Sequence, residues 1–317
     1  MNGGEPKIEI FAPFGAAFEL TKKILFQPFD LGKWCVIGFA AFLANLGGGF
    51  NFRYNYNQRS DLREWQGFQN LIDEINQIPH WIVVLGVASL VILILVIVVV
   101  FAWLRARGRF MFIDCIVKNR GAIVEPWREF RKEGNSYFLF SLLIGCAFLV
   151  IVALLALPFL LPIVRGVTFL HLHDVYLISM IVLWAVVFLL LVFAWALVAH
   201  FMVAVMYRRR WRAHEAFRMA LSLIASYPGE ITLYCLFWIV LVLGTAFVAC
   251  ASMCVTCCIA LIPYVGTVIL LPLYVWLRGF SLMFLRQFGP DYDVWAGVQQ
   301  PEPLLPPPSP GPPSLST

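Results

Sequence analysis

The longest uninterrupted apolar stretch covers residues 81–104, which carry no charged side chain and are followed at once by Arg105, Arg107 and Arg109. These twenty-four residues would form a helix about 36 Å long, enough to cross the roughly 30 Å hydrocarbon core of a membrane. Clustered Lys and Arg beside a span resist translocation and stay on the cytoplasmic side. The pattern therefore predicts a transmembrane helix that ends in the cytoplasm.

Further apolar stretches predict five more spans, at about residues 31–46, 137–164, 176–206, 231–255 and 259–284. The first of these is short and runs into three glycines, so it would rely on local thinning of the bilayer. The connection between the last two is very short. The apolar pattern thus predicts six transmembrane helices.

Each pair of spans is preceded by a stretch in which apolar residues recur at helical spacing among charged ones. Such amphipathic stretches are typical of helices that lie at a membrane surface. The first ends at Pro28, the second begins near Pro126, and the third ends at Pro228. The predicted apolar faces of the first and third are Phe14, Ala17, Phe18, Thr21, Ile24 and Leu25, and Ala213, Phe217, Ala220, Leu221 and Ile224.

The end of the span at 81–104 recurs along the chain. The sequence FAWLRARGRFMF from Phe101 returns in looser form as FAWALVAHFMVAV from Phe193 and as YVWLRGFSLMF from Tyr274. Repeats that contain an even number of spans enter the membrane from the same side. The predicted fold class is therefore all-α: a polytopic membrane helical bundle with six transmembrane helices in three parallel two-span repeats, at about residues 8–110, 120–207 and 208–290.

The distribution of Lys and Arg orients the predicted spans. With both termini in the cytoplasm, the external side holds four of the 23 basic residues, namely Arg53, Arg59, Arg63 and Arg165. The opposite orientation would place almost all of them on the wrong side. We therefore expect a multi-pass protein of the cell (inner) membrane, with an integral membrane domain over residues 1–298. Residues 299–317, rich in proline, are expected to form a disordered cytoplasmic tail.

Composition agrees with this pattern. Hydrophobic residues make up 61% of the chain, charged residues 13%, and the mean hydropathy is +0.84. Soluble proteins carry about 25% charged residues. The net charge of +5 comes from basic residues between the spans, where they set topology and do not indicate nucleic-acid binding. The predicted partners are membrane lipids and, through the Pro-rich tail, another protein.

No stretch of the sequence indicates a reaction or a cofactor. Nucleophilic triads, phosphate-binding loops and zinc-protease motifs are missing, so we expect a protein that is not an enzyme. Two groups of side chains have the residue types of metal ligands: Cys250, Cys254, Cys257 and Cys258, and His171, His173 and Asp174. The cysteines are more typical of small residues packed between helices. The two histidines and Asp174 are more typical of a solvated loop. No metal site is predicted.

The candidate binding residues lie near the repeated aromatic ends. Arg105 and Arg278 each follow a tryptophan by two residues, Trp103 and Trp276, and the middle repeat offers His200 at a nearby position. Two interpretations are open. In the first, the arginines simply extend to lipid headgroups from separate helices, as basic side chains near helix ends do. Alternatively, the three side chains form one cytoplasmic basic cluster that binds a lipid phosphate or an anionic substrate.

Two segments carry a resemblance to known proteins. FELTKKILFQPFDLGKW, from Phe18, and PLYVWLRGFSLMFLRQFGPDY, from Pro272, together with the layout of the spans, resemble an uncharacterised prokaryotic family of multi-pass membrane proteins. That family is distantly similar to the membrane domain fused to some glycerophosphodiester phosphodiesterases. The resemblance covers most of residues 8–295 and implies the fold alone. It implies no catalytic residue, because the phosphodiesterase catalytic domain is absent from the sequence.

The function expected from these features is a non-enzymatic, lipid-associated or scaffolding role. One alternative is a transporter-like protein that moves or binds an anionic or lipid substrate. It would need a polar path through the membrane, for which the predicted spans offer few groups. A second alternative is a membrane subunit that supports a separate lipid-metabolising enzyme.

Overall fold

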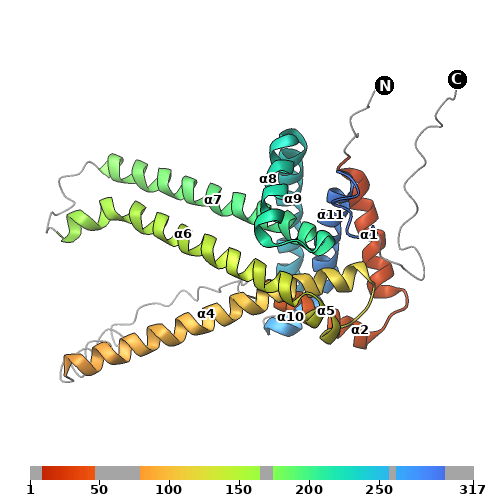
Figure 1. Ribbon diagram of the computed structural model, residues 1–317, viewed down its shortest axis with the longest axis horizontal. Coiled ribbons are helices and arrows are strands. Elements are labelled where there is room, and N and C mark those ends of the chain that lie inside the picture. The colour runs from red at the N-terminus through yellow and green to blue at the C-terminus, as the bar shows by residue number, and fades with distance from the viewer. Residues whose placement is uncertain (1–8, 47–78, 165–173, 257–261, 297–317) are drawn as a thin grey trace.

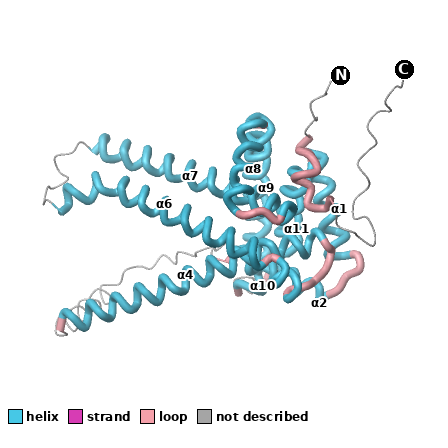
Figure 2. The backbone as a smooth tube through the Cα atoms, viewed as in Figure 1, coloured by secondary structure: helices cyan, strands magenta, loops and turns pink. Residues whose placement is uncertain are grey.

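The computed structural model describes residues 9–46, 79–164, 174–256 and 262–296 (Figure 1). Within these ranges the chain forms helices and no β-strand, which confirms the all-α prediction (Figure 2). The predicted external loop, the Pro-rich tail, and His171, His173, Cys257 and Cys258 lie outside the described residues. The helices are α1 (Phe11–Phe26), α2 (Leu31–Asn45), α4 (His80–Val117), α5 (Val124–Glu129), α6 (Arg131–Val164), α7 (Asp174–Arg209), α8 (Ala213–Ser226), α9 (Pro228–Val255), α10 (Pro263–Ile269) and α11 (Leu271–Arg286).

Four of the described helices, α4, α6, α7 and α9, are long and apolar enough to cross a membrane. They match four of the six predicted spans. Helix α2 is a shorter apolar helix of 15 residues. The stretch predicted as a single span at 259–284 is divided in its described part, because α10 ends at Ile269 and α11 starts at Leu271. Pro272 lies in the first turn of α11, where its missing N–H removes no helical hydrogen bond. In the middle of one continuous helix, the same proline would break the hydrogen-bond pattern.

Long apolar halves of α4, α6 and α7 extend from the body of the protein towards the same side (Figure 1). In α4 nearly every side chain from Trp81 to Phe101 is exposed, and the outer parts of α6 and α7 expose leucines and valines in the same way. Apolar surface of this extent is not stable in water. These exposed halves are compatible with a location in a membrane.

The packed core lies at the opposite, arginine-bearing ends of these helices. Helix α4 continues past its arginines as far as Val117, and this last part, including Phe110, Met111 and Ile113, is buried. Helix α2 packs here: a Cβ added to Gly108 would lie 2.6 Å from Leu43. The sequence after the arginines was expected to be a cytoplasmic segment following the span. In the structure its first part is the same helix and supplies much of the core.

The predicted amphipathic helices are present as α1, α5 and α8, and α1 ends just before Pro28 as expected. Their buried faces differ in part from the predicted ones. Leu20 and Leu223 are buried, whereas Phe18 and Leu221 are about half exposed. Helix α1 packs on α11 through Ala17 and Leu20, which meet Gly279. These short helices are therefore part of the core.

Candidate functional site

A pocket of about 450 Å³ lies where the ends of α2, α4, α7, α9 and α11 meet. The three candidate residues from the sequence, Arg105, His200 and Arg278, all line it. A fourth basic residue, Arg109, also lines it and was not chosen from the sequence. No carboxylate is found among the described residues that line the pocket. The pocket is thus basic, and its four basic side chains come from three different helices.

Arg278 and His200 contact each other directly, with 2.8 Å between Nη1 of Arg278 and Nε2 of His200. A guanidinium can only donate hydrogen bonds, so Nε2 must accept this one and the imidazole ring is neutral. His200 therefore orients the guanidinium of Arg278 without neutralising it. The pair keeps one full positive charge.

The other two arginines of the pocket extend from successive turns of α4. Arg109 donates a hydrogen bond to the hydroxyl of Tyr137 on α6, and its guanidinium lies 5.4 Å from the centre of that ring. Nε of Arg105 is buried and has no hydrogen-bond partner among the described residues. None of the three arginines pairs with a carboxylate within the described part of the chain. Their charges are therefore not balanced by the protein there.

Apolar side chains make up much of the remaining lining. Phe193 and Leu197 line the pocket from α7, and Trp238 and Val242 line it from α9, with the Trp238 ring 6.2 Å from that of His200. Phe193 precedes His200 by seven residues, about 10 Å along the helix axis, and directly follows the exposed apolar part of α7. Along α7 the pocket lining therefore runs from a basic end at His200 to an apolar end at Phe193, next to the exposed apolar surface.

Aromatic packing holds one wall of the pocket in place. The buried hydroxyl of Tyr234, on α9, lies 2.7 Å from that of Ser281 on α11. Its ring stacks on Phe284, with 4.5 Å between centroids, and contacts Phe201 of α7 at 5.4 Å. These contacts join α7, α9 and α11 next to His200 and Arg278.

Arg107 does not line the pocket, although in the sequence it lies between two arginines that do. Its guanidinium lies between the rings of Trp103 and Trp127, 4.5 and 4.8 Å from their centres. Oδ1 of Asn135 accepts hydrogen bonds from Arg107 and from the indole N–H of Trp103. Residues four apart share a helix face, and residues two apart do not, so α4 turns Arg107 away from Arg105 and Arg109.

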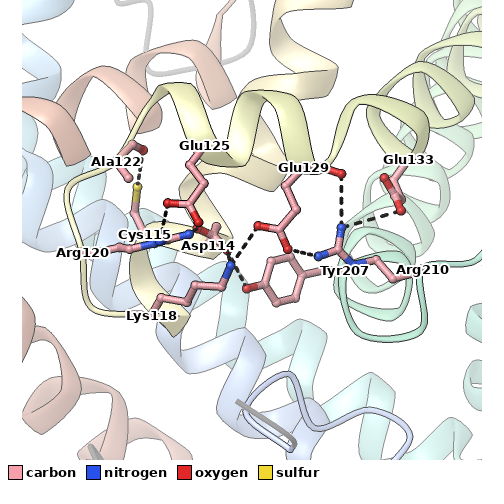
Figure 3. Close-up of polar contacts among 10 residues, drawn as sticks. All are labelled: Asp114, Cys115, Lys118, Arg120, Ala122, Glu125, Glu129, Glu133, Tyr207 and Arg210. Atoms are coloured by element: carbon pink, nitrogen blue, oxygen red, sulfur yellow. Dashed lines mark hydrogen bonds and ion pairs between the residues drawn. The ribbon is translucent and has the colours of Figure 1, made fainter. Parts of the chain in front are cut away.

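A second polar cluster joins the end of α4 to its neighbours (Figure 3). Asp114 is fully buried and accepts a hydrogen bond from the hydroxyl of Tyr207 at 3.0 Å. It also forms ion pairs with Lys118 at 2.8 Å and with Arg120 at 3.2 Å. Its charge and its hydrogen-bonding capacity are both satisfied, so this cluster serves as a structural tie between α4 and α7.

Glu129 extends the same cluster to α5 and to the residue that follows α7 (Figure 3). Its carboxylate pairs with Lys118 at 3.0 Å and with Arg210. Burial alone would raise the pKa of Glu129, but the hydrogen bonds and charges of Lys118 and Arg210 outweigh it and hold that pKa below its ordinary value. Acidic and basic side chains pair with each other in this cluster, in contrast to the pocket.

These helices and this pocket define an all-α protein with several helices apolar enough for a membrane and a basic pocket at their ends. The chain belongs to DUF7544, a family of unknown function, which matches over residues 9–286. This match confirms the expectation of an uncharacterised family. No curated protein and no solved structure matches the chain. The similarity to the membrane domain of glycerophosphodiester phosphodiesterases is not shown by these comparisons and stays a prediction.

Proposed function

We propose that the protein is an integral membrane protein that binds the anionic headgroup of a membrane lipid in the pocket formed by Arg105, Arg109, His200 and Arg278. The observation that carries the proposal is a pocket with three guanidinium groups and no carboxylate among its described lining residues. A buried charge without a partner is costly. An anion supplies that partner, and arginine forms strong, charge-assisted hydrogen bonds with phosphate oxygens. The role is binding and not catalysis.

The apolar end of the pocket supports a lipid over a soluble anion. Phe193, Leu197 and Val242 offer no polar group to a hydrophilic ligand, but they can pack against a hydrocarbon chain. This lining leads to the exposed apolar part of α7, where a lipid would already be present. A lipid could therefore enter with its headgroup towards the arginines and its chain towards the bilayer.

The proposed architecture has six spans in three parallel repeats, with both termini in the cytoplasm of the cell. The order of helices supports it: a short helix followed by two spans would correspond to α1, α2 and α4, then α5, α6 and α7, then α8, α9 and the pair α10 and α11. In this proposal α2 and the divided α10 and α11 are the two short spans. Each repeat then gives one of Arg105, His200 and Arg278 to the pocket, from its last helix.

Native mass spectrometry of the purified protein tests this function. Arg105→Gln and Arg278→Gln are each expected to lower the affinity for an anionic lipid about tenfold, the effect of losing one charge-assisted hydrogen bond, and the double variant more than either. Arg128→Gln is a matched control, because Arg128 is exposed on α5 and does not line the pocket. If arginines merely extend to headgroups from separate helices, Arg105 and Arg278 act independently of each other and lipid retention is unchanged. Equal retention in all variants would contradict the proposal.

A further inference from the structure

The pocket carries more positive charge than one ordinary phospholipid headgroup can balance. Arg105, Arg109 and Arg278 are always charged, and the contacts described for them are neutral: the Tyr137 hydroxyl and ring for Arg109 and the His200 imidazole for Arg278. Nε of Arg105 has no partner among the described residues. The basic end therefore holds about three positive charges that a ligand must offset.

Lipid headgroups differ in how much of this positive charge they can balance. A phosphodiester carries one negative charge and two free oxygens. A terminal phosphate, which is a phosphomonoester, carries about −1.5 to −2 at neutral pH and has three strong acceptor oxygens. Three guanidinium groups match three oxygens. The positive charge of the pocket that stays unbalanced falls from about two with a phosphodiester to about one with a terminal phosphate. We infer that the pocket formed by Arg105, Arg109 and Arg278 selects a lipid with a terminal phosphate over a phosphodiester lipid.

The shape of the pocket agrees with such a ligand. The volume of about 450 Å³ lies within the range of small-molecule sites, roughly 300–1,000 Å³, and exceeds what a phosphate group alone would fill. The remaining space is bounded by Phe193, Leu197 and Val242, which suit the first part of a hydrocarbon chain. A phosphodiester lipid would add a further headgroup substituent at the basic end, which Arg105, Arg109 and Arg278 line.

A competition experiment separates this inference from the proposed lipid binding on which it rests. The purified full-length protein in a neutral detergent receives equal amounts of phosphatidic acid and phosphatidylglycerol with identical acyl chains, and native mass spectrometry measures both bound species. Detergent micelles remove differences in membrane surface charge. We expect about a tenfold preference for phosphatidic acid, and a preference near one in Arg105→Gln and in Arg278→Gln. Arg128→Gln should keep the preference of the wild type.

Folding is checked by comparing thermal unfolding midpoints of all variants. Arg105→Gln should disturb the fold less than Arg278→Gln, because Nε of Arg105 has no partner among the described residues whereas Arg278 contacts His200. Equal binding of the two lipids by the wild type would overturn the terminal-phosphate inference and leave lipid binding intact. Failure to retain either lipid would overturn the proposed function as well. Displacement of phosphatidic acid by an equal concentration of inorganic phosphate would support the terminal phosphate and overturn the lipid as its source.

Discussion

Replacing Gly108 by alanine should destabilise the protein, because α2 and α4 touch at this residue. A Cβ at Gly108 would lie 2.6 Å from the carbonyl carbon and the Cβ of Leu43, and 2.7 Å from the backbone nitrogen of Ala44. Ordinary contacts of a Cβ begin at 3.4 Å, so α2 would have to move by at least about 0.8 Å. The obstructing atoms belong largely to the backbone and cannot rotate away.

The size of the effect follows from two opposing terms. Alanine is favoured over glycine in a helix by about 1 kcal/mol, whereas overpacking costs about 1–3 kcal/mol. A backbone clash places Gly108→Ala at the upper end of that cost, so we expect a net loss of about 1–2 kcal/mol in the free energy of unfolding. Gly86→Ala in the same helix is the matched control: nothing lies within 4 Å of its added Cβ, and it should be neutral or slightly stabilising.

Denaturant titration of the two variants in a mild detergent, followed by circular dichroism, measures this difference. Ala44 and Asn45 also line the pocket, so the displacement of α2 in Gly108→Ala should weaken lipid binding in parallel. Gly38→Ala should fall between the two variants, because the nearest atom to its added Cβ is a side-chain methyl of Val268. If Gly108→Ala proved as stable as Gly86→Ala, α2 could not pack against α4 in the way described.

Three further predictions concern the ion pairs and the orientation. Asp114→Asn should cost about 2 kcal/mol in the free energy of unfolding, because Asp114 is fully buried and loses its ion pairs. The cost is limited because its cationic partners are partly exposed and have other acids nearby. Denaturant titration measures this cost, and no loss would mean that the cluster does not stabilise the fold. The lowered pKa of Glu129 gives stability that is present above its ordinary pKa of about 4.3 and is lost as the pH falls through the lowered value. The thermal midpoints of wild type and Glu129→Gln should therefore differ most at neutral pH and converge as the pH falls through the lowered pKa, and a constant difference would contradict the assigned ion pairs. In a background without accessible native cysteines, an impermeant thiol reagent should label Asn57→Cys but not Arg128→Cys in intact cells, and the reverse result would overturn the proposed orientation.

The sequence was sufficient to predict where the long helices lie. Apolar stretches of sufficient length, ended by charges or by proline, are local signals, and the helices α4, α6, α7 and α9 follow them. The location of the core could not be predicted in this way. The sequence predicts a cytoplasmic segment from Arg105 onwards, but it does not predict that the residues from Phe110 to Val117 continue the helix and are buried. Their burial depends on α2, a contact that no local pattern encodes.

The candidate site was predicted in part. The repeated aromatic ends singled out Arg105, His200 and Arg278, and the structure places all three in one pocket. Arg109 was missed, although its spacing of four residues from Arg105 places both on one helix face. The different environment of Arg107 could not be predicted, because it depends on Trp127 and Asn135 in the following helices.

Helix α4 runs without interruption or proline through 38 residues, a length of about 57 Å. A helix of this kind behaves as a stiff rod, so its exposed apolar half and its arginine end change direction together. Transmembrane helices lean further in thinner bilayers. An added lean of 10° would shift one end of α4 relative to the other by about 10 Å across the membrane normal. In a membrane, bilayer thickness would therefore act mechanically on the arginines that face the pocket.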